Sequence, residues 1–212
     1  MRSNGGFIGG KKTVITSAAS GIWAIRDQQR ESGASNWPIL LGDFESIATT
    51  VLSSSTGTVT FSSIPQTYKH LQLRVIGKTD RALNRDSFRI QFNSDATTSN
   101  YRSHFLYGNG ASTSSADEGG TAGGVHYRLA GNSGATNIFG VSIVDVLDYA
   151  NTNKYKTTRC LGGLDLNGAD GEMYLGSAVW LSSSAITSFT IVPNTGTNFV
   201  QYSHFALYGI KG

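Results

Sequence analysis

The sequence predicts an all-β protein, a jelly-roll-like antiparallel β-sandwich preceded by an extended N-terminal arm with one short helix. Three observations support this fold class. From Phe44 onward apolar and polar residues alternate with the period of half-buried strands. Turn signals such as NGADG (167–171) and PNTGTN (193–198) separate the alternating runs. Only 15% of the residues are charged, which suits short strands joined by turns rich in Gly, Ser and Thr.

The first 42 residues differ from the rest, and we expect an arm at 1–42 followed by a sandwich domain at 43–212. Residues 1–16 have glycine at positions 5, 6, 9 and 10 and no apolar period, so an extended or flexible segment is expected.

A short helix is expected at 21–32 within the arm. Ser20 is a suitable N-cap, and Ile22 and Ile25 would share one face. Gly33, followed by the Asn36-Trp37-Pro38 turn, would end the helix. So few apolar residues cannot stabilise an isolated helix. The helix must therefore dock, either on its own sandwich or on another chain.

The sandwich is expected to contain eleven strands. Their predicted ranges are 44–52, 57–64, 70–79, 87–93, 101–108, 125–130, 138–149, 154–165, 171–181, 186–193 and 199–210. The run at 70–79 alternates clearly, with Leu71, Leu73 and Val75 on the face opposite Gln72, Arg74 and Ile76, as in a strand with one solvated face. The segment 109–124, rich in Gly, Ser and Thr, is expected to be a long exposed loop.

The charge balance argues against nucleic acid as a partner. Five basic and two acidic residues lie within 1–36, whereas 37–212 is neutral. A basic arm could meet an acidic protein surface, but three net charges are too few for a nucleic-acid footprint. Cys160 is the single cysteine, so neither an intrachain disulfide nor a cysteine-based zinc site can form. No signal peptide and no run of 18 apolar residues is visible, so synthesis in the cytoplasm without membrane insertion is expected.

No constellation of residues supports catalysis or metal binding. Gly77-Lys78-Thr79 resembles the end of a phosphate loop but lacks the required glycine at position 72. The run 165–172 departs from a calcium loop at Ala169 and Asp170, and a hairpin turn at Asn167-Gly168 explains the same letters. His104 and His204 both lie in Ser-His-Phe triplets and could approach each other in space. We expect no enzymatic activity, no metal and no cofactor.

Several stretches resemble structural proteins of tailed bacteriophages, which begin with a Gly-Gly-(Leu/Phe)-Ile-Gly run and a Ser-Gly-Ile-Trp helix. The matching segments of the arm are NGGFIG (4–9), SAASGIWAIRDQQ (17–29) and NWP (36–38). Those of the body are IPQTYKHLQLRVIGKTDR (64–81), FNSDATTSNYRSHFLYGNGAS (92–112) and FALYGIKG (205–212). The resemblance covers most of the chain.

The resemblance implies a non-enzymatic virion component, assembled in the host cytoplasm, that docks through its arm and presents the sandwich as a tail fibre or adhesion-type appendage. A homo-oligomer is expected, and a trimer is the usual fibre state. The alternatives are a capsid decoration or head-fibre protein and a carbohydrate-binding module that recognises a host-surface glycan. The expected docking residues of the arm are Phe7, Ile8, Ile22, Trp23, Ile25, Trp37 and Pro38. The expected surface-recognition residues are Tyr107, Tyr127 and Trp180.

Overall fold

The structure is a computed structural model of the chain. It describes residues 13–15, 18–20, 24–34, 42–168 and 170–212. The chain divides into two compact units, a short N-terminal unit at Met1–Gly42 and a large body at Asp43–Gly212.

The N-terminal unit contains a small hairpin and one helix. Strands β1 (Thr13–Ile15) and β2 (Ala18–Ser20) pair in antiparallel fashion, and helix α1 spans Ile25–Gly33. The carbonyl of Ala24 accepts the first helical hydrogen bonds, from the amides of Asp27 and Gln28. The prediction that Ser20 caps the helix is therefore wrong, because the hairpin occupies Ser20 and the helix begins later.

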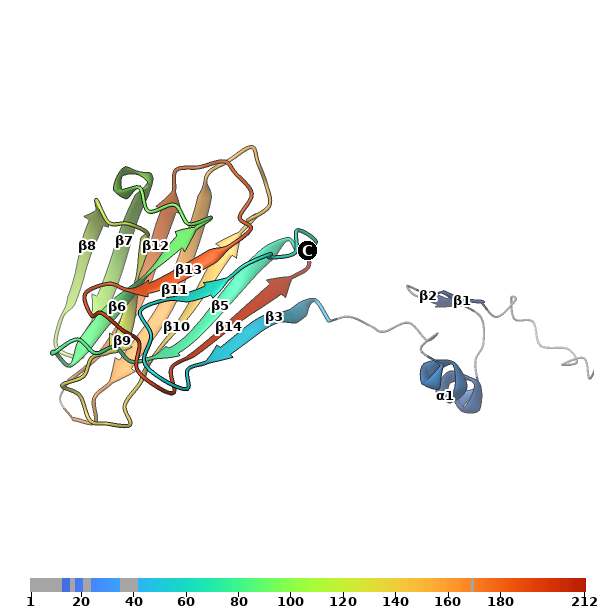
Figure 1. Ribbon diagram of the computed structural model, residues 1–212, viewed down its shortest axis with the longest axis horizontal. Helices are drawn as coiled ribbons and strands as arrows, with labels where there is room; N and C mark the ends of the chain where they lie inside the picture. The colour runs from blue at the N-terminus through green and yellow to red at the C-terminus, as the bar shows by residue number, and fades with distance from the viewer. Residues whose placement is uncertain (1–12, 16–17, 21–23, 35–41, 169) are drawn as a thin grey trace, which may run out of the picture. The chain divides into compact units, whose positions relative to one another are not determined.

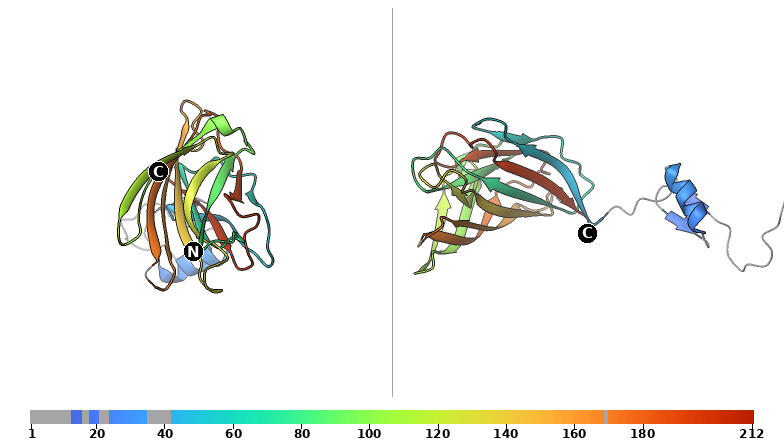
Figure 2. Two further views of the ribbon diagram at one scale, coloured as in Figure 1. Left: turned by 90° about the vertical axis from the view of Figure 1, so that its left-hand side faces the viewer. Right: turned by 90° about the horizontal axis from the view of Figure 1, so that it is seen from below.

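The body is an all-β antiparallel sandwich, as predicted. An eight-stranded sheet has the order β3-β14-β5-β10-β11-β12-β7-β8, and a four-stranded sheet has the order β4-β13-β6-β9 (Figures 1 and 2). The strands of the large sheet are β3 (Phe44–Val51), β5 (His70–Gly77), β7 (Tyr101–Gly108), β8 (Thr113–Gly119), β10 (Gly140–Leu147), β11 (Lys156–Asp165), β12 (Gly171–Trp180) and β14 (His204–Ile210). Those of the small sheet are β4 (Val59–Phe61), β6 (Arg85–Phe92), β9 (Gly124–Ala130) and β13 (Phe189–Pro193). A single 3-10 turn, η1 (Thr98–Asn100), precedes β7 within the part of the chain that the structure describes.

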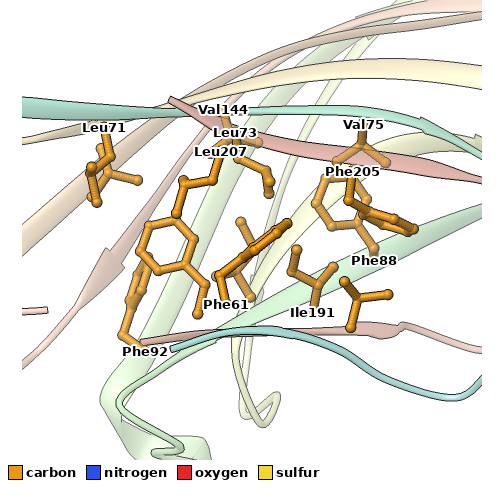
Figure 3. Close-up of a cluster of buried hydrophobic side chains, with 14 of the residues drawn as sticks. Phe61, Leu71, Leu73, Val75, Phe88, Phe92, Val144, Ile191, Phe205 and Leu207 are labelled. Carbon is orange, nitrogen blue, oxygen red and sulfur yellow. The ribbon is translucent and has the colours of Figure 1, made fainter. Parts of the chain in front are cut away.

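The core lies between the two sheets, where the inward side chains of both interdigitate (Figure 3). In β5, Leu71, Leu73 and Val75 are buried, whereas the intervening positions face outward, so the alternation predicted there is confirmed. The small sheet contributes large aromatic side chains such as Phe61 and Phe92 from the opposite side. Burial of this continuous apolar layer is the main stabilising contribution to the fold.

The segment 109–124 is not a loop throughout, because β8 occupies Thr113–Gly119 and pairs with β7. The turn between the two strands is built on Asn109, whose Oδ1 accepts hydrogen bonds from the amides of Ala111 (3.1 Å) and Ser112 (2.9 Å). Gly110 supplies the positive φ of 84° that the turn requires. The strand carries few apolar residues because it lies at the edge of the sheet, so alternation could not reveal it.

Two strands are each about five residues shorter than predicted. The run 57–64 forms strand only at Val59–Phe61. The run 199–210 enters the sheet only at His204, because Tyr202 has a φ of 71° and turns the chain just before β14.

Candidate interaction surface

The outer face of the eight-stranded sheet carries exposed apolar side chains in register across neighbouring strands. One row runs from Ile76 in β5 to Val141 in β10, Gly163 in β11 and Met173 in β12. A single strand shows only one or two of these residues. Their contiguity is created by the order of the strands in the sheet.

A second apolar row lies directly beside the first. Ile143 in β10 pairs with Leu161 in β11, Leu161 with Leu175 in β12, and Leu175 with Leu106 in β7. We refer to the residues of both rows as the apolar band. The apolar band consists of Ile76, Leu106, Val141, Ile143, Leu161, Met173 and Leu175, whose exposed fractions lie between 39% and 62%.

The sequence of β10 contains a pattern that points to this surface, although the pattern matches no catalytic or recognition motif. Its residues are apolar at both parities: Val144 and Val146 are buried, while Val141 and Ile143 face outward. A strand of an antiparallel sheet that faces water on one side normally has polar outward positions. Apolar residues on both faces of β10 therefore depart from that pattern.

The apolar band borders a hollow of about 470 Å³. Gly162, Gly163, Met173 and His204 are among the residues that line it. A Cβ atom at Gly163 would lie 2.9 Å from the sulfur of Met173, so the Met173 side chain leans over this glycine. Met173 therefore forms part of the wall of the hollow.

A row of polar side chains lies next to the apolar band, and several of them are hydrogen-bonded to one another. Asp145 accepts hydrogen bonds from Gln72 Nε2 (2.8 Å) and Arg159 (2.9 Å). Gln72 in turn accepts a hydrogen bond from Arg74 Nε at 2.9 Å. Asp145, Gln72, Arg74 and Arg159 are therefore joined in one hydrogen-bonded chain on this face.

An aromatic pair lies at the β3 side of the same face. The rings of Phe44 and Tyr208 stack with their centroids 4.8 Å apart. The Arg74 guanidinium lies 5.0 Å from the Phe44 centroid and 5.1 Å from the Tyr208 centroid, within cation–π range. Phe44 and Tyr208 thus place aromatic rings next to the hydrogen-bonding side chain of Arg74.

Most of the docking residues predicted for the arm lie outside the described residues, namely Phe7, Ile8, Ile22, Trp23, Trp37 and Pro38. Ile25 is described. It is the first residue of α1, and its side chain is 74% exposed. Ile25 is thus an exposed apolar side chain on an otherwise polar helix.

Of the residues predicted for surface recognition, the structure describes the side chains of Tyr107 and Trp180. Trp180 is only 3% exposed, and its Nε1 donates to Asp95, so the prediction that this ring is available to a ligand is wrong. Tyr107 is half-buried and shares its face with the buried Tyr174, opposite it in β12, with the Arg128 guanidinium over its ring. Tyr127 lies in β9, and its side chain is outside the described part of the structure.

The two histidines of the Ser-His-Phe triplets do not meet. His104 lies in β7 and His204 in β14, and four strands of the large sheet separate them. Within the described residues, no group of three or more His, Cys, Asp and Glu side chains is placed to hold a metal ion. In the same residues, no helix is long and apolar enough to cross a membrane.

The charged groups inside the body connect elements of the fold. Glu172 in β12 accepts hydrogen bonds from Arg85 in β6 and Arg128 in β9, which links the two sheets. Two buried lysines act in a similar way on loops. Lys78 Nζ donates to the carbonyl of Ala135 (2.9 Å), and Lys156 Nζ donates to that of Asn151 (2.6 Å). These groups are paired with fixed partners, and their arrangement is that of structural contacts.

The search of protein-family models and the search of curated proteins both found no match to this chain.

Proposed function

We propose that this protein is a non-enzymatic structural component of a tailed-bacteriophage virion. Residues 1–42 would dock on another virion protein, and the sandwich would be presented as a tail fibre or adhesion-type appendage. The single structural observation that carries this proposal is the apolar band on the outer face of the large sheet. Contiguous exposed apolar patches larger than a few hundred Å² are rare on proteins that act alone and mark interaction sites.

Two further features support the proposal. The chain has a separate N-terminal unit, Met1–Gly42, that is much smaller than the unit formed by the sandwich. The described part of this unit has one nine-residue helix, shorter than the length at which isolated helices are stable in water. Contact with another protein would supply the missing stabilisation. The sequence motifs of the arm resemble those of phage structural proteins, which gives the partner its class.

Mapping the protein in purified virions tests the proposal. Cryo-electron microscopy of the virion, with the chain confirmed by mass spectrometry, is expected to place residues 1–42 against a tail component and the sandwich outside it. Density on the capsid shell would instead favour the decoration or head-fibre alternative. Absence of the chain from virions would refute the proposal in both forms.

Carbohydrate binding is a second candidate function, favoured by the Phe44–Tyr208 pair. Stacked aromatic rings beside Arg74 and Gln72 combine an apolar platform with hydrogen-bonding groups, which is the chemistry that sugar rings require. A glycan array probed with the full chain and with the Phe44→Ala variant would test it. Glycan binding that persists unchanged in the variant would exclude this site.

A further inference from the structure

We propose that Asn167, in the turn between β11 and β12, is a modification site at which the side-chain amide converts spontaneously to a carboxylate. The inference is independent of the proposed function. The structure describes two Asn-Gly pairs of the sequence, Asn109-Gly110 and Asn167-Gly168. Both are exposed turns between paired strands, but their side chains are held differently, and this difference selects Asn167.

Deamidation of an asparagine is a reaction between its side chain and the next residue's backbone nitrogen. The nitrogen attacks Cγ, the new C–N bond closes a cyclic imide, and the C–N bond of the carboxamide breaks. Ammonia leaves with the proton that the attacking nitrogen gives up. Water then opens the imide at either of its carbonyls, which yields aspartate or isoaspartate. A glycine in the next position leaves the attacking nitrogen without a neighbouring side chain to hinder it.

The geometry of the β11–β12 turn explains why asparagine stands at position 167. Its φ is 58°, in the left-handed region that asparagine enters more readily than most residues. The amide of Asn167 donates to Asp165 Oδ1 at 2.8 Å, and the Leu166 amide donates to the Asp170 carbonyl at 3.1 Å. The residue types that suit this turn are thus also a reactive pair.

The Asn167 side chain is free to reach the backbone of Gly168. Both residues are exposed, so water has access to them. Among the described residues, the Asn167 carboxamide has no hydrogen-bond partner, since the bond to Asp165 is made by the backbone amide. A Cβ atom added at Gly168 would meet no atom within 4 Å, so the space around the attacking nitrogen is open.

Asn109 is restrained by contrast. Its Oδ1 accepts hydrogen bonds from the amides of Ala111 (3.1 Å) and Ser112 (2.9 Å) and from the Ser112 hydroxyl (3.3 Å). Attack by the Gly110 nitrogen requires the carboxamide to turn out of these bonds. Because two or three hydrogen bonds of ordinary strength must break first, conversion at Asn109 should be at least about tenfold slower than at Asn167.

Peptide mapping by mass spectrometry of the full chain, stored folded in mildly alkaline buffer, tests the inference. The method reports each asparagine separately. Asn167 is expected to convert faster than Asn109 and to give two product peptides, one with aspartate and one with isoaspartate. Conversion at Asn167 alone lowers the formal net charge of +3 by one, because a neutral amide becomes a carboxylate.

The Gly168→Ala variant tests whether the Gly168 nitrogen is the attacking group. Gly168 has open space around it and does not have a left-handed φ, so alanine should fit without strain and leave the circular dichroism spectrum unchanged. The added methyl group lies beside the attacking nitrogen and should slow conversion at Asn167 at least about tenfold. Asn109 in the same variant is the internal control and should keep its rate.

Unfolding the chain in urea tests whether the fold sets the difference between the two sites. Both are Asn-Gly pairs, so they should convert at similar rates once the hydrogen bonds of Asn109 are lost. Equal rates in the folded chain, a difference that persists in urea, or an unchanged rate at Asn167 in Gly168→Ala would each overturn the inference. None of these results bears on whether the chain is present in virions, on which the proposed function depends.

Discussion

The indole Nε1 of Trp180 donates a hydrogen bond of 2.7 Å to the Oδ2 of Asp95. Trp180 is the last residue of β12, and Asp95 lies in the turn that follows β6, so the bond ties the large sheet to a connection from the small one. Asn100 Nδ2 donates to the same oxygen, and the amide of Thr97 donates to Oδ1. Asp95 therefore organises one end of the sandwich.

Neutralising Asp95 should destabilise the protein in a pH-dependent way. Partial burial raises the pKa of Asp95, but the hydrogen bonds from Trp180, Asn100 and Thr97 outweigh it and lower the pKa to about 2. The folded-state pKa of Asp95 lies below the ordinary value. The ionised carboxylate therefore stabilises the folded state above about pH 4, and this stabilisation is lost as the pH falls toward 2. Asp95→Asn is expected to cost about 1–2 kcal/mol at pH 7, measured by urea unfolding. A variant that loses the same free energy at pH 7 and at pH 2 would contradict this account.

The Trp180–Asp95 contact also shows why sequence reasoning misplaced the recognition surface. Alternation in 171–181 defines two faces but does not say which one is the core, and a tryptophan suits either a core or an exposed binding surface. The inward face is defined by a contact between residues far apart in the sequence, since the Trp180 ring packs against Phe92 of the small sheet.

The parts of the fold that were predicted correctly depend on the alternation of apolar residues within one strand. The parts that were missed depend on how strands pair with one another. The alternation in 70–79 predicted β5 and its buried face, because Leu71, Leu73 and Val75 alone define the period. β8 has no such pattern, since an exposed edge strand does not need apolar residues. The apolar band consists of residues far apart in the chain that the strand order brings into register, so no window of sequence contains it.

His126 should make the protein sensitive to mild acid. Its imidazole packs against Phe88, with the ring centroids 5.6 Å apart, and neither ring nitrogen has a hydrogen-bond partner in the described structure. Burial lowers the pKa of His126 to about 3. The unfolded chain then binds more protons than the folded chain below about pH 6.5, so stability falls as the pH decreases through this range.

Replacing His126 should remove this acid sensitivity. Between pH 7 and pH 4.5, protonation linked to His126 is expected to lower the free energy of unfolding by up to about 3 kcal/mol, because each pKa unit corresponds to about 1.4 kcal/mol. His126→Leu should unfold with a smaller difference between the two pH values in urea titrations. An unchanged difference would mean that other groups control the acid response.

Glu172 should be among the most sensitive charged positions of the body. Its carboxylate is buried and bonded to both Arg85 and Arg128, so Glu172→Gln would leave the guanidinium groups without a full counter-charge. Removal of one partner from a buried ion pair costs about 3–5 kcal/mol. Arg159→Gln serves as the comparison, because Arg159 forms an exposed pair with Asp145 and should change the unfolding free energy by less than about 1 kcal/mol. Equal losses in both variants would refute the importance assigned to burial at Glu172.

Lys156 should hold the loops around the start of β11 in place. The residue is fully buried, and its ammonium group donates to the carbonyls of Asn151 (2.6 Å), Lys154 (3.0 Å) and Ser183 (3.1 Å). Lys156→Met keeps much of the side-chain volume but leaves these carbonyls without their donor, at an expected cost of about 2 kcal/mol or more. Because the bonded carbonyls lie in surface connections, local opening there should increase more than global unfolding.

Limited proteolysis of the full chain should therefore show faster cleavage between residues 150 and 155. The exposed Lys154→Met variant is the control, and faster cleavage in it to the same extent would show that the buried ammonium group is not what restrains this loop.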